Sequence, residues 1–195
     1  MATIIGLSGR RGVGKSAVSD ILVRDHGFTR IHPFGGGKVA SKGYFMHLGA
    51  SPDEAERMVN GDLKDEPSPF LPDNVAPRYF MERFGKFMVT TLGPAWTIGQ
   101  EVRLALEKDP EAKLLADSVV YEADVIRASG GLVVKIDRPS ATLVGIETDR
   151  ALDALIPDLV FDNSGSCLLD LSRRVDVLLD QIAEHQRAHD PILEF

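Results

Sequence analysis

The sequence predicts an α/β fold in which a parallel β-sheet is flanked by helices. Strand and helix patterns alternate at both ends of the chain. The strand patterns are short, nearly unbroken apolar runs, as in sheets that are buried on both faces. The 195 residues are 44% hydrophobic and 26% charged, which excludes a disordered or collagen-like chain and fits one domain over residues 1–195.

The N-terminal part supplies the first alternation. An apolar strand over 3–7 leads into a glycine-rich turn and then into a helix over 15–26, which Gly27 ends. A second strand over 28–32 stops before Pro33 and the glycines that follow it. Two strands joined by a crossover helix are the unit from which parallel sheets are built.

The middle of the chain predicts helices rather than strands. In one of them, Phe80, Phe84, Phe87 and Met88 recur at helical spacing and predict a buried face. A proline-rich irregular loop separates the helices into two pairs. Residues 35–110 are therefore expected to form a helical insertion in the domain. The expected segments are helices over 38–48, 52–59, 75–92 and 97–106, with the loop over 61–74.

The C-terminal part returns to alternating strands and helices. Its strands are short and apolar, and its last helix has a long apolar stripe. This pattern extends the parallel sheet of the N-terminal part. The expected segments are strands over 113–116, 132–136 and 159–161, and helices over 121–129 and 168–182.

Charge and cysteine content narrow the classes of protein. With 22 lysines and arginines against 29 acidic residues, the net charge is −7, which disfavours tight sequence-independent binding of nucleic acid but permits a local basic cleft. The single Cys167 excludes an internal disulfide, disfavours a cysteine-based zinc site and favours the cytoplasm. No apolar run reaches the length of about 20 residues that a membrane helix needs, and the N-terminus lacks the basic start of a signal peptide.

The turn after the first strand carries the strongest chemical signal. Its residues fit the phosphate-loop pattern G-x-x-x-x-G-K-S/T at every fixed position, between a strand and a helix. Glycines let the backbone wrap around a polyphosphate, and the helix N-terminus favours negative charge. Lys15 is expected to reach the β- and γ-phosphates and the Ser16 hydroxyl to bind Mg²⁺. The expected nucleotide-binding residues are Gly9, Arg10, Arg11, Gly12, Val13, Gly14, Lys15, Ser16 and Ala17.

The phosphate loop predicts a nucleoside triphosphate but not a reaction. The chain has no N-K-x-D guanine motif, and its D-x-x-G match at 162–165 follows the last expected strand, which disfavours a GTPase. The chain is also short for a motor or transport ATPase. A small-molecule kinase that uses ATP and Mg²⁺ fits best.

Two acidic residues are candidates for the catalytic side of such a kinase. Asp117 ends the 113–116 strand, and the carboxyl ends of strands line the ligand crevice of open α/β sheets. It is expected to hold Mg²⁺ together with Ser16 or to accept a proton, although it could instead cap the following helix. Glu122 is a candidate contact to the acceptor or a first-turn helix acid.

Several cations and one tryptophan are candidates for phosphate and acceptor binding. Arg127, at the end of a short helix, could clamp the phosphates or serve only as a helix-end charge. Lys38 follows three glycines, a setting that suits a phosphate or a plain turn. Arg78, Arg83 and Lys86 form a basic stripe that suits a monophosphate or is simply solvated. Trp96 either stacks on a base or belongs to the core.

Taken together in this order, these residues make the chain resemble the bacteriophage deoxynucleoside monophosphate kinases. The most specific stretch, 117–139, carries an aspartate, an acidic residue, a helix that ends in glycines, a strand and Arg-Pro. Dephospho-coenzyme A kinases are a more distant likeness. The resemblance is carried by residues 3–16, Lys38, 78–85, Trp96, 117–139 and 158–166.

The resemblance implies a nucleoside-monophosphate-kinase-like fold whose helical insertion binds the acceptor. It implies transfer of the γ-phosphoryl group of ATP, with Mg²⁺, to a deoxynucleoside monophosphate, by a phage-encoded enzyme acting in the host cytoplasm. Arg138 and Asn163 match positions that bracket the adenine of ATP. Arg78, Arg83, Lys38, Glu82 and Trp96 are implied on the acceptor side. The implied partner is a small-molecule nucleotide, with no membrane; a homodimer is a further possibility.

Four positions depart from the pattern of that family. Val119 stands where the family usually has arginine, Glu82 where it has glutamine, and Ser16 where it more often has aspartate; an acid near Gly36 is missing. These changes leave a second acceptor open, the hydroxymethyl group of 5-hydroxymethyluracil or a related pyrimidine within DNA, with Glu82 or Asp117 as the base. A nucleotide-binding regulator without turnover is the third hypothesis.

Overall fold

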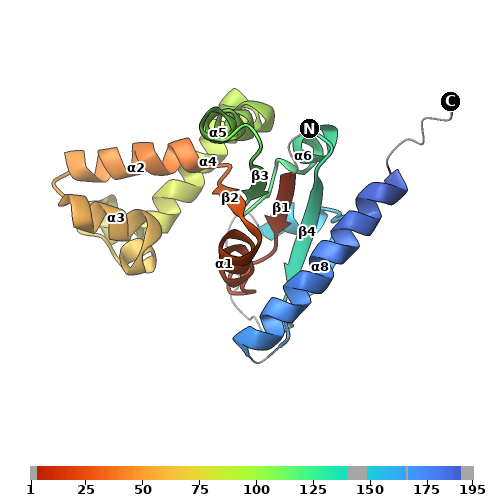
Figure 1. Ribbon diagram of the computed structural model, residues 1–195. Helices are drawn as coiled ribbons and strands as arrows, with labels where there is room; N and C mark the ends of the chain where they lie inside the picture. The colour runs from red at the N-terminus through yellow and green to blue at the C-terminus, as the bar shows by residue number, and fades with distance from the viewer. Residues whose placement is uncertain (1–3, 140–148, 166, 190–195) are drawn as a thin grey trace. The chain divides into compact units, whose positions relative to one another are not determined.

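The computed structural model of the chain describes residues 4–139, 149–165 and 167–189 (Figure 1). Its contacts divide the chain into two compact units. The first, named the core unit here, comprises residues 1–31 and 105–195. The second, named the helical unit, comprises residues 32–104.

The core unit is built on a five-stranded sheet in which each pair of neighbouring strands is parallel. Its order is β2-β3-β1-β4-β5. The central strand is buried at every position, and its Gly6 lies opposite Ala116 on one side and Val133 on the other. The predicted α/β fold class is confirmed. The strands are β1 (Ile4–Ser8), β2 (Phe28–Ile31), β3 (Lys113–Ala116), β4 (Leu132–Asp137) and β5 (Leu159–Asp162).

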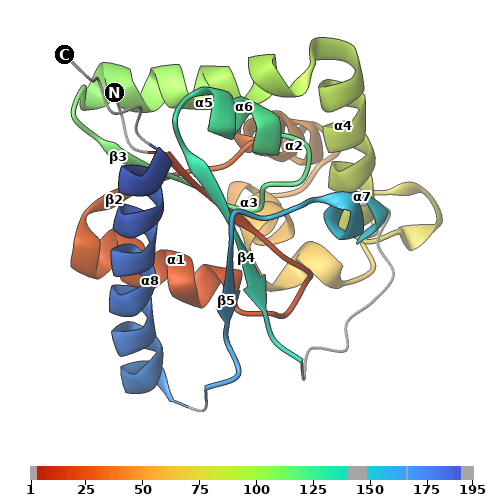
Figure 2. The same ribbon diagram turned by 90° about the vertical axis from the view of Figure 1, so that its right-hand side faces the viewer.

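Helices cover both faces of this sheet. Helices α1 (Lys15–His26) and α8 (Leu168–His189) pack side by side on one face (Figure 2), where Val18 and Leu22 meet Val175 and Leu178 in one apolar core. Helix α6 (Ala123–Ala128) lies on the other face. There its Ile126 packs so closely over Gly6 that a Cβ at Gly6 would touch it. Helix α7 (Asp149–Ala154) precedes β5.

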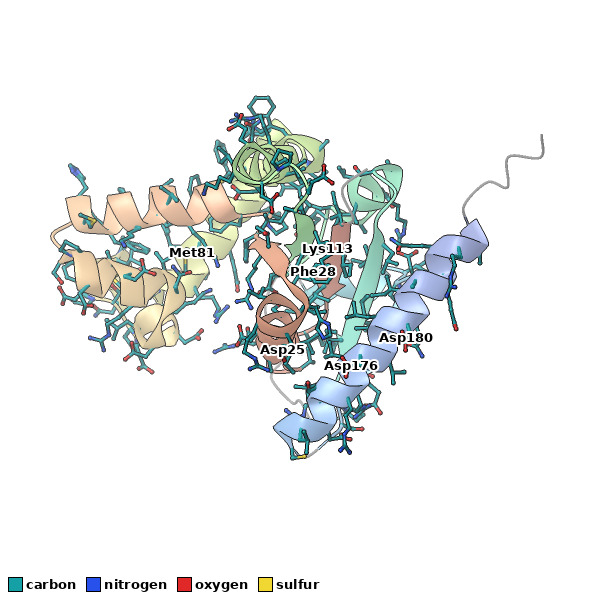
Figure 3. The ribbon with its side chains drawn as sticks, viewed as in Figure 1. Asp25, Phe28, Met81, Lys113, Asp176 and Asp180 are labelled. Carbon is teal, nitrogen blue, oxygen red and sulfur yellow. The ribbon has the colours of Figure 1, made fainter. Side chains whose placement is uncertain are left out.

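The edge of the sheet next to α1 adds one contact to this packing. In Figure 3, Phe28 at the start of β2 lies beside Lys113 at the start of β3, and the Lys113 ammonium stands 5.0 Å from the centre of the Phe28 ring. The two strands pair in parallel from this first residue onward. Gly27, directly before β2, ends α1 in the left-handed conformation, as the sequence predicts.

The helical unit has an apolar core of its own. Met81 of α4 lies on the side of that helix that meets α2 and α3 (Figure 3), beside the buried Phe45, Ala55 and Met58. Ser51 and Glu54 form a capping box that begins α3. The elements are α2 (Gly35–His47), α3 (Pro52–Asn60), the 3-10 helices η1 (Asp62–Asp65) and η2 (Pro72–Asn74), α4 (Pro77–Leu92) and α5 (Pro94–Lys108), whose last residues belong to the core unit.

Some local expectations differ from the structure. The predicted irregular loop over 61–74 contains η1 and η2, because 3-10 turns are too short to show a helical period. Helix α7 has no counterpart in the prediction. The predicted apolar face of α4 is misplaced at its end, since Phe87 is 58% exposed whereas Met81 is buried. Phe80 and Phe84 do pack, in a chain of ring contacts with Phe34, Tyr44 and Phe45.

The helices in the part of the chain that the structure describes can be compared with a membrane span. None of its helices combines the length and the apolar character that crossing a bilayer requires.

Candidate nucleotide-binding site

The turn between β1 and α1 has a backbone that only glycine fits at two of its positions. Gly9 has a φ of 135° and Gly14 a φ of 93°, both in the left-handed half of conformational space. A Cβ on Gly9 would collide with the carbonyl oxygen of Ile136, and one on Gly14 with the side-chain amide of Asn163. The fixed glycines of the motif are therefore required by the geometry of the loop itself.

The N-terminus of α1 is suited to an anion. Gly14 is the capping residue and has no side chain with which to bind the first amides, and the first turn contains no acidic residue. Ser16, in that turn, is exposed. Backbone amides that no cap satisfies, together with the positive end of the helix, are the elements of a phosphate site.

Two contacts fix the loop in position. Val13 is buried in the apolar core of the core unit, which anchors the middle of the loop. The Nδ2 group of Asn163 donates to the carbonyl oxygen of Val13 at 2.8 Å, and the backbone amide of Asn163 donates to Asp137 at 2.6 Å. Asn163 is only 5% exposed. It was expected at the adenine of ATP; the contact that the structure gives it holds the phosphate loop.

Lys15 lies over its own loop. Its ammonium donates to the carbonyl oxygens of Gly9 at 2.8 Å and of Arg10 at 2.9 Å. These contacts hold the charge at the loop, where a polyphosphate cradled by the same backbone would meet it. Arg10 itself forms an ion pair with Asp153 of α7 at 2.8 Å, which fastens that short helix to the loop. Arg11 is half-buried. The contact with the adenine of ATP that is expected for Arg138 remains a prediction.

Asp117 lies at the carboxyl edge of the sheet, beside the phosphate loop. It follows β3 directly, and its backbone amide donates to Ile31 at 2.9 Å. Two residues later Val119 donates to Leu7 at 2.8 Å, one residue before the end of β1. Asp117 is 9% exposed. The alternative that it caps the next helix is wrong, because α6 begins only at Ala123.

The connections after β1 and β3 diverge at this point. The loop after β1 leads to α1 on one face of the sheet, whereas the loop after β3 leads to α6 on the other. Neighbouring parallel strands whose connections leave toward opposite faces open a crevice at their carboxyl ends, where ligands of α/β proteins bind. The phosphate loop and Asp117 follow these two strand ends directly, where this rule places a ligand.

The donor groups at this edge fit magnesium bound to phosphate. In the described residues, no three His, Cys, Asp or Glu side chains gather into a metal site of their own. Mg²⁺ ordinarily takes one or two protein oxygens and completes its shell with water and substrate phosphates. The Ser16 hydroxyl and the Asp117 carboxylate are of the required kind, and their metal role remains a prediction.

Glu122 has a structural place in the loop after β3. It is 3% exposed, and its Oε2 accepts hydrogen bonds from the backbone amides of Val120 at 3.1 Å and Tyr121 at 3.0 Å. Burial raises the pKa of this carboxyl, against the effect of the amides. The geometry makes Glu122 a brace for the loop that begins at Asp117, and does not present it to an acceptor.

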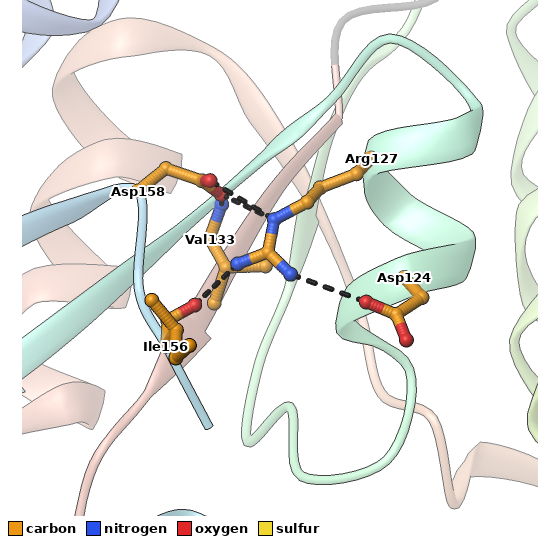
Figure 4. Close-up of polar contacts among 5 residues, drawn as sticks. All are labelled: Asp124, Arg127, Val133, Ile156 and Asp158. Carbon is orange, nitrogen blue, oxygen red and sulfur yellow. Dashed lines mark hydrogen bonds and ion pairs between the residues drawn. The ribbon is translucent and has the colours of Figure 1, made fainter. Parts of the chain in front are cut away.

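Arg127 is not a phosphate clamp. Its Nε donates to both carboxylate oxygens of Asp158, at 2.9 and 3.1 Å, and its Nη groups bind Asp124 and the carbonyl oxygen of Ile156 (Figure 4). Asp158 also accepts from the amide of Val133, at the start of β4. In a parallel sheet the strand starts lie at the edge opposite the phosphate loop. The arginine therefore joins α6 to the starts of β4 and β5.

The acceptor-side candidates other than Glu122 lie in the helical unit. Arg78 of α4 forms a two-pronged ion pair with Asp65 of η1, at 2.5 and 2.9 Å. The hydrogen bonds to Asp65 raise the pKa of Arg78 further, so it stays charged. Glu82 and Lys38 are half-buried, whereas Arg83 is exposed and stacks on Tyr79 at 4.4 Å. The structure thus brings Arg78 together with an acidic partner rather than in an isolated basic stripe.

Trp96 and the glycines before Lys38 have settings that the sequence left open. Trp96 is 57% exposed on α5, so the core alternative is wrong. Gly36, at the start of α2, donates its amide hydrogen to Oε1 of Glu101 at 2.9 Å. A Cβ at Gly35 would collide with the same carboxylate. Sequence reasoning missed Glu101, because it lies 65 residues further along the chain.

Lys64 is a second residue that sequence reasoning missed. It lies on η1 beside Asp65 and is half-buried. Burial, together with the charges of Arg78 and Lys38, lowers the pKa of Lys64 to about 8. The signal in the sequence is only a lysine between Leu63 and Asp65, in a segment that lacks periodicity.

Comparisons with known proteins found similar solved structures but no similar sequence. No protein-family model matches the sequence, and no curated protein sequence does either. Dephospho-CoA kinase from Campylobacter jejuni is 15% identical and covers 93% of this chain and 97% of its own, with a TM-score of 0.46. The Thermus thermophilus protein TT1252 is 18% identical and covers 93% of this chain and 98% of its own, with a TM-score of 0.47. Shikimate kinase from Aquifex aeolicus is 14% identical and covers 93% of this chain and 99% of its own, with a TM-score of 0.43. At these identities and TM-scores, none of the likenesses assigns an activity or a substrate to this chain.

Proposed function

We propose that this protein is an ATP-dependent kinase whose acceptor is a deoxynucleoside monophosphate. The observation that carries the proposal is the phosphate loop: Gly9 and Gly14 in conformations only glycine fits, at a helix N-terminus with no side-chain cap. Such a loop binds the polyphosphate of a nucleoside triphosphate. Lys15 would neutralise the charge of the β- and γ-phosphates, and Ser16 and Asp117 would hold Mg²⁺, which would offset the negative charge of the phosphates.

The transfer itself needs little covalent chemistry from the protein. An oxygen of the acceptor phosphate bonds to the γ-phosphorus of ATP, the bond from that phosphorus to the β–γ bridging oxygen breaks, and ADP leaves with the electron pair. A phosphate acceptor is already ionised near neutral pH, so no base is needed. Catalysis then rests on positioning and on neutralising charge, which Lys15 provides on the ATP side.

The acceptor class rests on the helical unit and on the resemblance described above. Arg78 is held by Asp65 in an ion pair, and Lys38 and Lys64 add positive charge near it. Cations that are fixed in this way favour a phosphate monoester over a neutral acceptor. Trp96, exposed on α5, is available to stack on a base.

One observation favours a second candidate, a kinase of the hydroxymethyl group of a pyrimidine within DNA. Such an acceptor is a neutral alcohol and needs a base, and Glu82 places a half-buried carboxylate among the cations of the helical unit. The net charge of −7 opposes this candidate, because binding to DNA depends on neutralising backbone phosphates.

An acceptor panel tests the proposal. The purified chain is incubated with Mg²⁺ and ATP labelled at the γ-phosphate, together with each of the four deoxynucleoside monophosphates or with a hydroxymethyluracil-containing oligonucleotide. Label in at least one deoxynucleoside diphosphate, and its loss in a Lys15→Ala variant, is the expected result. Label in the oligonucleotide alone would establish the second candidate. Binding of ATP with no transfer to any acceptor would leave a nucleotide-binding regulator.

A further inference from the structure

The short helix η1 places Lys64 directly before Asp65, which forms the ion pair with Arg78. Leu63 packs on the apolar core of the helical unit, and Asp65 holds Arg78 of α4. Lys64 lies between them, on an element that packs against both α3 and α4. Its backbone is therefore held on either side, and its side chain is half-buried.

The charges that act on Lys64 come from three elements. Lys38 on α2 and Arg78 on α4 are positive, whereas Asp65 on η1 and Glu82 on α4 are negative. Among the other nearby groups, Arg57 of α3 binds Asp62 at 2.7 Å. Glu56 of α3 binds Lys42 at 2.6 Å and also interacts with Lys38 through its charge. Among the described residues that act on Lys64, counting Lys64 itself, three cations thus face two carboxylates.

This imbalance has a measurable consequence. Burial is the largest cause that lowers the pKa of Lys64 to about 8, and the repulsion from Arg78 and Lys38 adds to it. Asp65 and Glu82 do not restore the ordinary value. A further negative charge would do so, because it would stabilise the ammonium form.

We propose that Lys64 provides, with Lys38 and Arg78, the third positive charge of a site in the helical unit that binds the phosphate monoester of the acceptor. This inference rests on the proposed function and deepens it, since it assigns a residue and a charge state to acceptor binding. A dianion beside these three cations adds a negative charge that each of them attracts. Arg78 supplies a planar fork, and the lysines supply point charges.

The proposal predicts that acceptor binding takes up a proton. Near pH 8.5 a lysine with a pKa of about 8 is largely neutral, and the arriving dianion raises its pKa and draws a proton from the buffer. The phosphate group of the acceptor does not contribute, because its own second pKa of about 6 leaves it a dianion at this pH. Well below pH 8, Lys64 is already charged in the free protein, and the uptake is expected to vanish.

Titration calorimetry of the full chain tests this. Thymidine monophosphate is titrated at pH 8.5 in two buffers of different ionisation enthalpy, and the difference in heat gives the protons taken up. We expect a substantial fraction of a proton per site in the native chain. The Lys64→Met variant, which keeps an unbranched apolar stem, is expected to take up almost none and to bind about 10-fold more weakly, as loss of one charged contact implies.

Two controls separate the source of the effect. Lys108→Met, at the exposed end of α5, is expected to match the native chain in affinity and proton uptake. Thymidine, which lacks the phosphate, is expected to give no proton uptake. Inorganic phosphate is expected to reproduce the uptake with weaker binding, because it shares the charge but not the base.

The outcomes distinguish this inference from the function on which it rests. Native affinity and native proton uptake in Lys64→Met would overturn the role of Lys64, while label transfer to the monophosphate would still establish the kinase. Absence of binding by the native chain for every deoxynucleoside monophosphate would overturn both. Thermal melting of Lys64→Met checks that it folds. Because its buried charge is removed, its Tm at pH 7 is expected to equal or exceed that of the native chain.

Discussion

The candidate sites of the core unit and of the helical unit differ in the groups that form them. In the core unit the site is mainly backbone: the amides of the phosphate loop, fixed by glycine conformations and by the buried Val13. In the helical unit it is made of side chains from several helices, and its best-fixed cation, Arg78, is held by a carboxylate. A backbone site is specified within a dozen neighbouring residues, whereas a side-chain site exists only when separate elements pack correctly.

The largest effect is expected from Lys15→Ala, which removes the lysine proposed to neutralise the β- and γ-phosphates. Phosphoryl transfer should fall by about 10³-fold or more, because charge stabilisation in the transition state is lost. The measurement is the initial rate of label transfer at saturating ATP. Lys108→Ala, an exposed lysine of α5, is the matched control. A variant rate close to native would show that Lys15 of the phosphate loop does not take part in phosphoryl transfer.

Asp117→Asn is expected to have the next largest effect. It keeps the size of a 9% exposed side chain but removes its charge, so kcat should fall by about 10²-fold while the melting temperature changes little. Steady-state kinetics at several Mg²⁺ concentrations measure it. If kcat is unchanged, the role of Asp117 is limited to the structure of the turn after β3. Its carboxylate then takes no part in the site of the core unit.

Arg78→Ala tests the helical unit in the same way. The KM for the acceptor should rise by about 10-fold or more, because hydrogen bonds to charged groups contribute about 1.5–3 kcal/mol, while the KM for ATP stays the same. Arg57→Ala is a matched control, since Arg57 binds Asp62 through an equivalent fork outside the proposed site. Equal effects of the two substitutions would mean that Arg78 acts only by bracing η1.

The smallest effect on catalysis is expected from Arg127→Met. Its ion pair with Asp158 joins α6 to the starts of β4 and β5, so its loss should lower the free energy of unfolding by about 1–3 kcal/mol and leave kcat near native. Urea unfolding and steady-state kinetics, measured on the same preparation, give both numbers. A large fall in kcat with unchanged stability would instead support the phosphate-clamp role that the sequence suggested for Arg127.

Local patterns in the sequence predicted the sheet well. The apolar run at 113–116 coincides with β3, and the alternation of strands with helices predicted the parallel arrangement. The glycine-rich turn could be recognised for the same reason, because the residues that shape it are adjacent in the chain. The helix expected over 52–59 is found as α3 (Pro52–Asn60), and the capping box of Ser51 and Glu54 that begins it is local in the chain.

Contacts between distant residues were beyond the reach of these patterns. Arg127 stands at the end of a short helix, and nothing in its neighbourhood shows that Asp158, 31 residues later, would bind it. Glu101 meets the start of α2 across 65 residues. The pKa of Lys64 is lowered by its burial and by the charges of Arg78 on α4 and Lys38 on α2. The exposure of Trp96 likewise depends on which face of α5 packs, since its position along the helix permits either setting.

The sequence by itself determined the parallel sheet and the phosphate loop, because apolar runs, glycine conformations and the start of a helix act between neighbours along the chain. Only the tertiary structure decided which charged groups meet. It set Arg127 in an ion pair at the far edge of the sheet, set Asn163 against the phosphate loop, and gathered Lys38, Lys64 and Arg78 with Asp65 and Glu82. Coulombic interaction and desolvation depend on distance in space and on burial, which packing alone establishes.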